Sequence, residues 1–229
     1  MTAAVVFDYG LTIVTFVYPE AALLAVLERF RPAITQAIGR EAPAATELMA
    51  RVLMPLEDTL QTFGMDEVDY LQVYDEAWRA VGIELPRDLL YRVLDAEQRC
   101  WDAAVRFTPG AIETLQQLRV RGLKTGIASN AAFPPEMMHR QLRDIGLAPL
   151  LDAAVFSSEI GKRKPSPELY RAVLERLGVS PAESLYVGDR LIEDYEGPRQ
   201  VGMRSVLYAR EAPDGVERIE RLDQLEALL

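Results

Sequence analysis

After residue 108 the chain alternates between short apolar runs and stretches with helical periodicity, and this alternation restricts the fold more than any other feature of the sequence. Strands that alternate with helices are joined by right-handed crossovers, which make the strands parallel and cover both faces of their sheet. The sequence therefore predicts an α/β fold, a Rossmann-like open parallel sheet with helices on both faces. The strands are predicted at 3–7, 123–129, 153–156, 184–187 and 204–208, and the later helices at 135–145, 167–177, 194–201 and 216–228.

The first of these strands is separated from the others by a long segment of different texture. In that segment the apolar residues recur with helical spacing, which predicts four or five helices and no strand. Pro32 and Pro55 are expected to break or kink those helices. We therefore predict one Rossmann-like core made of residues 1–15 and 107–229, with a helical domain of residues 16–106 inserted between its first and second strands.

The charge balance and the single cysteine exclude several classes of protein. The 229 residues carry 25 basic and 35 acidic side chains, a formal net charge of −10, which disfavours a nucleic-acid partner. No apolar run approaches the roughly 20 residues that span a bilayer, and no basic segment precedes the first apolar residues as a secretory signal requires. Cys100 has no second cysteine to pair with, which is typical of a reducing compartment. We expect a cytoplasmic monomer or homodimer that acts on a small molecule, without a nucleic-acid or membrane partner.

Polar side chains follow four of the predicted strands at the points where those strands end. Because the carboxyl ends of parallel strands meet at one edge of an open sheet, ligands bind there. Residues far apart in the sequence are therefore predicted to meet at a single site. They are Asp8 and Thr12 after the first strand, Ser129 and Asn130 at the second, Lys164 in the basic loop after the third, and Asp189 and Asp194 after the fourth.

These segments resemble, in the same order, the four motifs of the haloacid dehalogenase-like superfamily. The helical segment is similar to the cap that one subgroup of the superfamily inserts after its first motif. The resemblance covers nearly the whole chain and implies a hydrolase, and within the superfamily a phosphatase of small phosphorylated metabolites. The matching segments are Asp8-Tyr9-Gly10-Leu11-Thr12, Ser129-Asn130, Lys164-Pro165-Ser166-Pro167, and Gly188-Asp189 followed by Asp194.

The resemblance implies that Asp8 is the nucleophile, which would attack phosphorus and form an aspartyl-phosphate. It implies Mg²⁺ as the cofactor, held by the carboxylates of Asp8 and Asp189 and by the backbone carbonyl of Gly10. Lys164 would be the catalytic lysine, and Asp194 would support the water shell of the metal or orient that lysine. The charges agree with a divalent cation, because three carboxylates and one ammonium leave two negative charges uncompensated.

Three further residues are implied to contact the phosphoryl group: Ser129 would donate to its oxygens, with help from Thr12 and the backbone of Asn130. Two of them also have an ordinary structural interpretation, because Ser129 can cap a helix and Thr12 can satisfy its own turn. Lys162 competes with Lys164 for the catalytic role, and the Lys-Pro-x-Pro context favours Lys164.

One position departs from the motif. Phosphatases of the superfamily carry a second aspartate two residues after the nucleophile, which protonates the leaving alcohol, and this chain has Gly10 there. General acid–base assistance is worth about 10²–10⁴-fold in rate. Its loss favours substrates with good leaving groups, such as acyl phosphates, or an acid borrowed from the cap; Tyr9 and Tyr18 lie nearby in the sequence.

The same departure leaves other functions open. The chain could be a non-catalytic or regulatory protein that binds phosphate and metal but has lost turnover through Gly10. Relatives that cleave carbon–halogen bonds also lack the second aspartate, but they need no metal, and the pair Asp189 and Asp194 argues against that chemistry.

Overall fold

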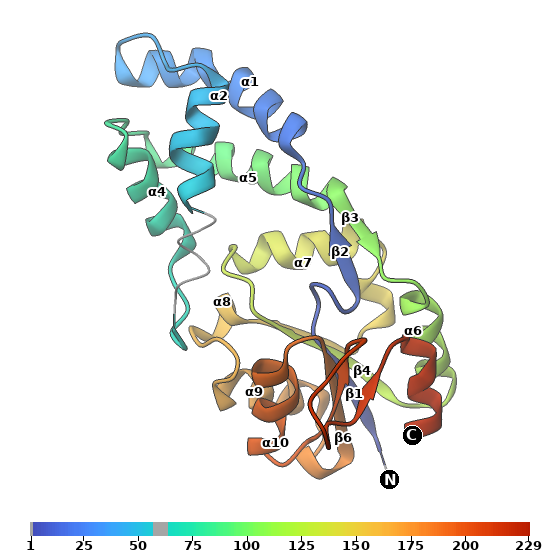
Figure 1. The fold of residues 1–229 in the computed structure, drawn as a ribbon. Coiled ribbons are helices and arrows are strands. Elements are labelled where there is room, and N and C mark those ends of the chain that lie inside the picture. Colours follow the sequence, from blue (N-terminus) through green and yellow to red (C-terminus); the bar gives the residue numbers. More distant parts are fainter. Residues whose placement is uncertain (1, 57–63) are drawn as a thin grey trace.

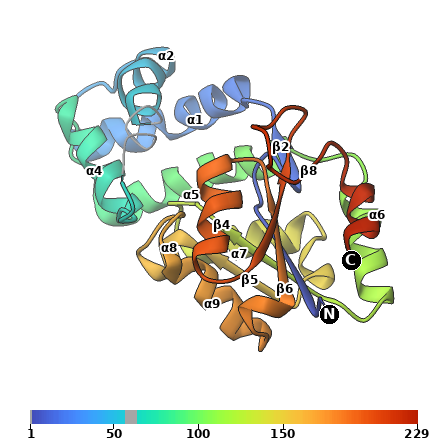
Figure 2. The ribbon, with the colours of Figure 1, turned by 60° about the horizontal axis from the view of Figure 1, so that its bottom comes forward.

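A six-stranded sheet forms the centre of the computed structural model, which describes residues 2–56 and 64–229. Its strand order is β5-β4-β1-β6-β7-β8, and every neighbouring pair is parallel. Helices cover both faces of the sheet (Figures 1 and 2), which confirms the predicted α/β Rossmann-like fold.

The strands are β1 (Ala4–Phe7), β4 (Lys124–Ser129), β5 (Ala153–Phe156), β6 (Ser184–Gly188), β7 (Arg204–Tyr208) and β8 (Arg218–Ile219). The helices around them are α6 (Ala111–Val120), α7 (Pro135–Asp144), α8 (Ser157–Ile160), α9 (Pro167–Leu177) and α10 (Gly197–Gln200), with short helical turns η2 (Ala148–Leu150), η3 (Pro181–Glu183), η4 (Leu191–Glu196) and η5 (Leu222–Leu228).

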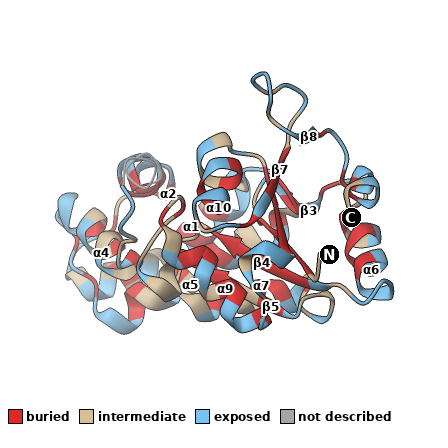
Figure 3. Cartoon of the chain, turned by 90° about the horizontal axis from the view of Figure 1, so that it is seen from below, coloured by how far each residue is buried: buried red, intermediate tan, exposed pale blue. Residues whose placement is uncertain are grey.

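The side chains of the central strand β1 alternate between the two faces of the sheet, and both sets are buried. Val5 and Phe7 pack in the cluster that includes residues of α6 and α7, whereas Ala4 and Val6 pack with residues of α9. All four are fully buried, as expected for a strand inside a parallel sheet covered on both faces. Figure 3 shows the buried strands between helices whose outer surfaces are exposed.

A two-stranded antiparallel ribbon leads out of the sheet domain and back into it. It consists of β2 (Val14–Phe16) and β3 (Val105–Phe107), neither of which the sequence predicted, because three residues are too few for an alternating pattern to be detected. The predicted domain boundaries fall in this ribbon and remain a prediction. Between its strands lie α1 (Glu20–Ile38), α2 (Ala45–Leu48), the π-helical turn η1 (Met49–Leu53), α4 (Tyr70–Ala80) and α5 (Arg87–Ala104), which we call the inserted helices.

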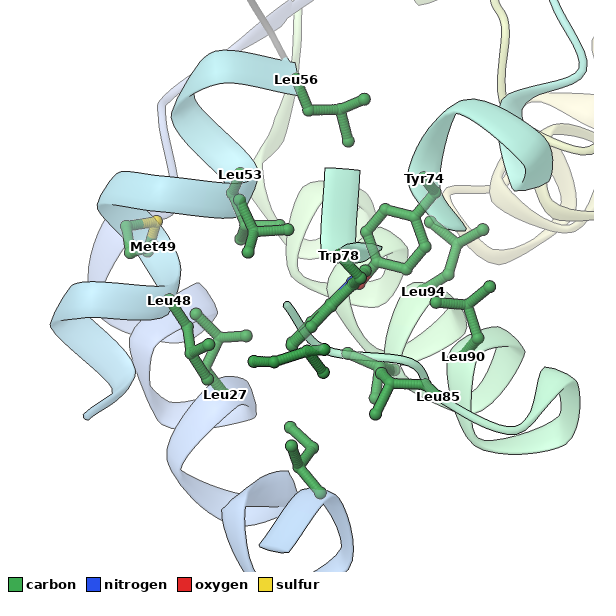
Figure 4. Packing of buried hydrophobic residues seen from close by; sticks show 14 of the residues in the cluster. Leu27, Leu48, Met49, Leu53, Leu56, Tyr74, Trp78, Leu85, Leu90 and Leu94 are labelled. Atoms are coloured by element: carbon green, nitrogen blue, oxygen red, sulfur yellow. The ribbon is translucent and has the colours of Figure 1, made fainter. Parts of the chain in front are cut away.

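The inserted helices have a hydrophobic core of their own. On α4, Tyr70, Tyr74 and Trp78 follow one another at four-residue spacing, so their rings lie on one face of the helix. Figure 4 shows Tyr74 and Trp78 packed among leucines from the neighbouring helices, and both rings are fully buried. None of the helices within the described ranges has both the length and the apolar character needed to cross a membrane.

Pro32, which was expected to break or kink its helix, does not break it but lies inside α1, where Leu27 and Ile34 are buried on either side of it. Burial of this face outweighs the roughly 3 kcal/mol that a proline costs within a helix. The helix predicted at 216–228 is instead strand β8 followed by the 3₁₀ helix η5, because residues 218–219 extend the sheet beside β7.

The inserted core predicts a large effect of truncating its central ring. Trp78→Ala should lower the free energy of unfolding by about 3–5 kcal/mol, because a fully buried tryptophan leaves a large cavity. Val120→Ala is the control: Val120 is 89% exposed, so its truncation should change stability by less than about 0.5 kcal/mol. Urea unfolding followed by circular dichroism measures both; equal midpoints for the two variants would contradict the packing described.

Candidate active site

Four loops that follow strands of the sheet bring polar side chains to one edge. Asp8 follows β1, Ser129 ends β4, Lys164 lies in the loop between α8 and α9, and Asp189 follows β6. Strands β4, β1 and β6 are neighbours in the sheet. Their carboxyl ends therefore place these residues next to one another, although Asp8 and Ser129 are 121 positions apart in the sequence.

The ammonium group of Lys164 is the centre of this cluster. Its Nζ donates to Asp8 Oδ1 at 2.7 Å, to Asp194 Oδ1 at 2.7 Å and to the Tyr186 hydroxyl at 3.0 Å. Burial alone would lower the pKa of Lys164, but the carboxylates of Asp194 and Asp8 outweigh burial and raise it. The lysine is therefore charged, and all three of its protons have acceptors.

The nucleophile candidate Asp8 is held by two donors at the same oxygen. Ser129 Oγ donates to Asp8 Oδ1 at 2.6 Å, in addition to Lys164. The backbone amide of Asp8 donates to the Val187 carbonyl, so the residue stays in register with β6 at the strand end. The Asp8 residue is 7% exposed. Its carboxylate is thus fixed in orientation while still lining a cavity.

Asn130 holds the loop that carries the lysine. Its side-chain Oδ1 accepts from the Lys164 backbone amide at 2.7 Å, and its Nδ2 donates to the Lys164 carbonyl at 3.3 Å. The side chain therefore acts on the protein backbone. A contact between the Asn130 backbone and a phosphoryl group remains a prediction.

Asp194 reaches the lysine only because residue 188 is a glycine. A Cβ atom at Gly188 would lie 2.4 Å from Asp194 Cγ, far inside van der Waals contact. Asp194 is fully buried, and its second oxygen accepts from the Arg190 backbone amide at 2.9 Å. Burial raises its pKa, and the ammonium of Lys164 opposes that rise.

The three aspartates form a set of oxygen ligands that fits a divalent cation. Asp8, Asp189 and Asp194 each offer a carboxylate oxygen, and these oxygens lie within 4.8 Å of one another. Asp189 Oδ1 is buried and has no hydrogen-bond partner in the part of the chain that the structure describes. Burial and the neighbouring Asp8 raise the pKa of Asp189. An unpartnered oxygen in an all-carboxylate cluster suits a hard cation such as Mg²⁺.

A cavity of about 460 Å³ opens above this cluster, between the sheet domain and the inserted helices. Its floor includes Asp8, Ser129 and Lys164, and residues of the inserted segment, among them Trp101 of α5, form part of its wall. Thr12 is not among its lining residues; that side chain is fully buried, and its hydroxyl has no partner among the described residues. The predicted contact of Thr12 with a phosphoryl group therefore stays a prediction.

The other sequence candidates lie elsewhere or are engaged. Lys162 forms an ion pair with Asp66 rather than with the aspartate cluster. His139 contacts Glu159 at 3.0 Å and packs against the ring of Phe156, and it is not among the residues that line the cavity. The Tyr9 hydroxyl donates to Gln141 Oε1 at 2.7 Å, and burial raises its pKa well above the usual range.

Sequence reasoning missed Tyr186, the third acceptor of the Lys164 ammonium. The Tyr186 hydroxyl also donates to the Ala128 carbonyl at 2.6 Å, which joins β6 to β4 beneath the site. In the sequence this tyrosine is one residue of an apolar strand, and only the alternation of β6 could have assigned its face.

Comparison with known proteins gives one family. A family model described as haloacid dehalogenase-like hydrolase matches residues 2–202. A glyceraldehyde 3-phosphate phosphatase of Methanopyrus kandleri is 31% identical over 211 residues, which cover 92% of this chain and 85% of the relative. The crystal structure of a HAD phosphatase from Thermococcus onnurineus is similar with a TM-score of 0.64 at 25% identity, over 100% of this chain and 97% of that one. A 2-haloacid dehalogenase from Pseudomonas syringae shares the fold, with a TM-score of 0.70 at 22% identity over 100% and 98% of the two chains.

The close approach at residue 188 can be tested by stability alone. Gly188→Ala should lower the free energy of unfolding by about 1–3 kcal/mol or more, because its methyl group displaces Asp194 from Lys164. Gly10→Ala is a matched control in the same site: its Cβ would lie 3.6 Å from a carbon of the Phe16 ring, an ordinary contact. Urea unfolding should leave this control within about 0.5 kcal/mol of the parent; equal losses would show that the Gly188 contact is not decisive.

Proposed function

The chain belongs to the haloacid dehalogenase-like hydrolase family, and on that premise we propose that it is a Mg²⁺-dependent phosphatase of small phosphorylated metabolites. The reaction would pass through an aspartyl-phosphate on Asp8. The observation that carries the proposal is the Asp8 carboxylate itself, fixed by Ser129 and Lys164 at the floor of a cavity. The phosphatase activity named for the Methanopyrus relative supports the substrate class.

The two oxygens of Asp8 have different surroundings. Ser129 and Lys164 both donate to Oδ1, and within the described residues no donor contacts Oδ2. One oxygen is therefore held while the other is available to attack phosphorus. Like charges about 4 Å apart repel by roughly 4 kcal/mol at an effective dielectric of 20. The ammonium of Lys164 reduces that repulsion as the phosphate approaches.

Mg²⁺ would be held by the carboxylates of Asp8 and Asp189 and by the backbone carbonyl of Gly10. The ion, when bound, supplies positive charge that stabilises the phosphoryl oxygens. Asp194 would keep Lys164 in place, since the two groups are 2.7 Å apart and both are buried. The unpartnered oxygen of Asp189 is the observation that supports this assignment.

Contacts to the transferred group would come from the same edge of the sheet. Ser129 can turn its hydroxyl from Asp8 toward a phosphoryl oxygen, with the backbone of Asn130 beside it in the cavity lining. Thr12 would assist through its unpartnered hydroxyl. Apart from the rotation of the Ser129 hydroxyl, the groups that line the cavity are in place before the substrate arrives, so they cost little reorganisation during transfer.

The inserted helices would act as a cap that excludes water from the reaction. Helix α5 of the insertion contacts helix α7 of the sheet domain. Arg140 of α7 forms ion pairs there with Asp95 and Asp102 of α5. Gln141 of α7 donates to Asp102 at 2.7 Å and accepts from Tyr9, beside the nucleophile. The cap would therefore be connected to the first motif by a continuous set of hydrogen bonds.

Replacement of the nucleophile tests the proposal directly. Asp8→Asn should reduce Mg²⁺-dependent phosphate release from acetyl phosphate by about 10³-fold or more, because an amide cannot form the aspartyl-phosphate. Chelation of the metal should stop the parent enzyme, and added Mg²⁺ should restore it. Asp223→Asn replaces an exposed carboxylate of η5 that does not line the cavity, and this control should behave like the parent. Activity that survives both Asp8→Asn and chelation would refute the mechanism, whereas binding of Mg²⁺ and phosphate without turnover of any ester would support the non-catalytic alternative.

The missing acid can be supplied by substitution. Gly10→Asp should raise kcat/KM for glycerol 3-phosphate by at least about tenfold, because general acid catalysis is worth about 10²–10⁴-fold. A side chain can begin at this position, since the Cβ of residue 10 would meet the Phe16 ring at 3.6 Å, an ordinary contact. Gly10→Asn has nearly the same shape without the proton and should not produce the gain. Equal rates for the two variants would show that proton transfer at this position does not limit the reaction.

A further inference from the structure

Aromatic side chains make up much of the cavity wall near Asp8. Trp101 of α5 meets the Phe16 ring edge to face, with ring centres 6.4 Å apart. Tyr70 of α4 and Phe133 of the loop before α7 have ring centres only 4.5 Å apart. All four rings line the cavity, together with Met138. A leaving group bound above Asp8 would therefore lie among aromatic faces and edges.

The cations of the cavity lining already face carboxylates. Lys164 lies between Asp8 and Asp194. Arg163 pairs with the buried Glu67 at 3.0 Å, and Arg190 lies 3.5 Å from Glu193. No other lysine or arginine is among the described residues that line the cavity. A second anionic group on the substrate, such as a carboxylate, would therefore have to compete with Glu193 for the exposed Arg190, whereas an uncharged ring has several partners on the wall.

The lack of a proton for the leaving oxygen favours the same kind of substrate as the aromatic wall does. Gly10 offers no proton, and the proton of Tyr9 is donated to Gln141 at 2.7 Å. Since neither residue 10 nor Tyr9 offers a proton to the leaving oxygen, its departure as an anion is favoured. A phenol, like the tyrosine side chain, ionises with a pKa of about 10, whereas an aliphatic hydroxyl resembles water, near 16. Departure without a proton is therefore far easier for a phenolate than for an alkoxide.

We propose that the preferred substrate is a small phosphate monoester of an uncharged aromatic alcohol, an aryl phosphate whose ring binds between Phe16, Trp101 and the Tyr70–Phe133 pair. This proposal rests on the proposed phosphatase function and narrows its substrate class. A bond forms between an Asp8 oxygen and phosphorus while the bond from phosphorus to the aryl oxygen breaks, and its electron pair leaves with the phenolate. Water then attacks phosphorus, the bond between phosphorus and the Asp8 oxygen breaks, and the Asp8 carboxylate is regenerated, while both protons of the water leave with the released phosphate as dihydrogen phosphate.

Binding can be separated from reactivity with phosphonates, which cannot be hydrolysed at the same position. Benzylphosphonate and propylphosphonate carry the same charge, and calorimetry with the Mg²⁺-loaded protein should show benzylphosphonate binding at least about tenfold more tightly. Turnover should follow the same preference: kcat/KM for phenyl phosphate should exceed that for glyceraldehyde 3-phosphate by at least about tenfold. In a series of substituted phenyl phosphates the rate should rise as the pKa of the leaving phenol falls.

Phe16 provides a variant with a matched control. Phe16 and Phe107 lie on the two strands of the same ribbon and are both 37% exposed, but only Phe16 lines the cavity. Phe16→Ala should lower the affinity for benzylphosphonate by about two- to tenfold relative to the affinity for propylphosphonate, as expected for loss of one aromatic contact. Phe107→Ala should leave that ratio unchanged. Trp101→Leu is a second variant, which should raise KM for phenyl phosphate more than it lowers kcat.

The outcomes distinguish this proposal from the function on which it rests. Equal affinity for the two phosphonates, together with Asp8-dependent hydrolysis of acetyl phosphate, would overturn the aryl preference and leave the phosphatase function standing. Tight binding of benzylphosphonate without phosphate release from any ester would overturn both the phosphatase function and the claim that the aryl phosphate is a substrate. The aryl preference would also be overturned if Phe16→Ala and Phe107→Ala reduced the preference for benzylphosphonate equally, because the ring would then bind outside the cavity.

Discussion

The ion pairs of Lys164 with Asp8 and Asp194 are the interaction on which the rest of the site depends. A buried ammonium is stable only when its charge is compensated and its protons are accepted, and removing one partner of a buried pair typically costs about 3–5 kcal/mol. Here the compensation comes from loops after two different strands, β1 and β6. Two other features of the site maintain these contacts: Asn130 holds the Lys164 backbone, and Gly188 leaves room for Asp194. The geometry that the proposed catalysis needs and the pairing needed for stability are therefore the same.

Much of this site was predictable from the sequence because a parallel sheet converts separation along the chain into proximity at one edge. Asp8, Ser129, Lys164 and Asp189 each follow an apolar run, and the alternation of strands and helices is enough to bring those runs side by side. The strands at 153–156 and 204–208 also have the predicted bounds; the first is a continuous apolar run, and the second contains the apolar run Val206–Tyr208.

What the sequence did not reveal depends on tertiary contacts that leave no local pattern. Tyr186 accepts from Lys164 because its side chain lies on the face of β6 that meets the Lys164 loop. The sequence of β6 alone does not indicate which face meets that loop. The buried pair of Glu67 and Arg163 joins segments 96 positions apart. Pro32 remains inside a helix because the side chains on both sides of it are buried in the core of the inserted helices, which stabilises the helix there. In each case packing between distant segments determined the result and local propensity did not.

Phe16, where the inserted segment begins, lies beside position 10, where the second aspartate of the motif is missing. A side chain at position 10 would begin 3.6 Å from the Phe16 ring, so a proton donor there would stand against the aromatic wall. An apolar ring raises the pKa of a neighbouring carboxyl group by desolvation, which would keep such a donor protonated. In the proposed reaction, the ring would face the leaving group directly with glycine at this position, and residue 10 would offer no proton. The sheet domain would thus supply the chemistry at phosphorus, while the ribbon and the inserted helices would set what can leave from it, and these two requirements would meet at Gly10.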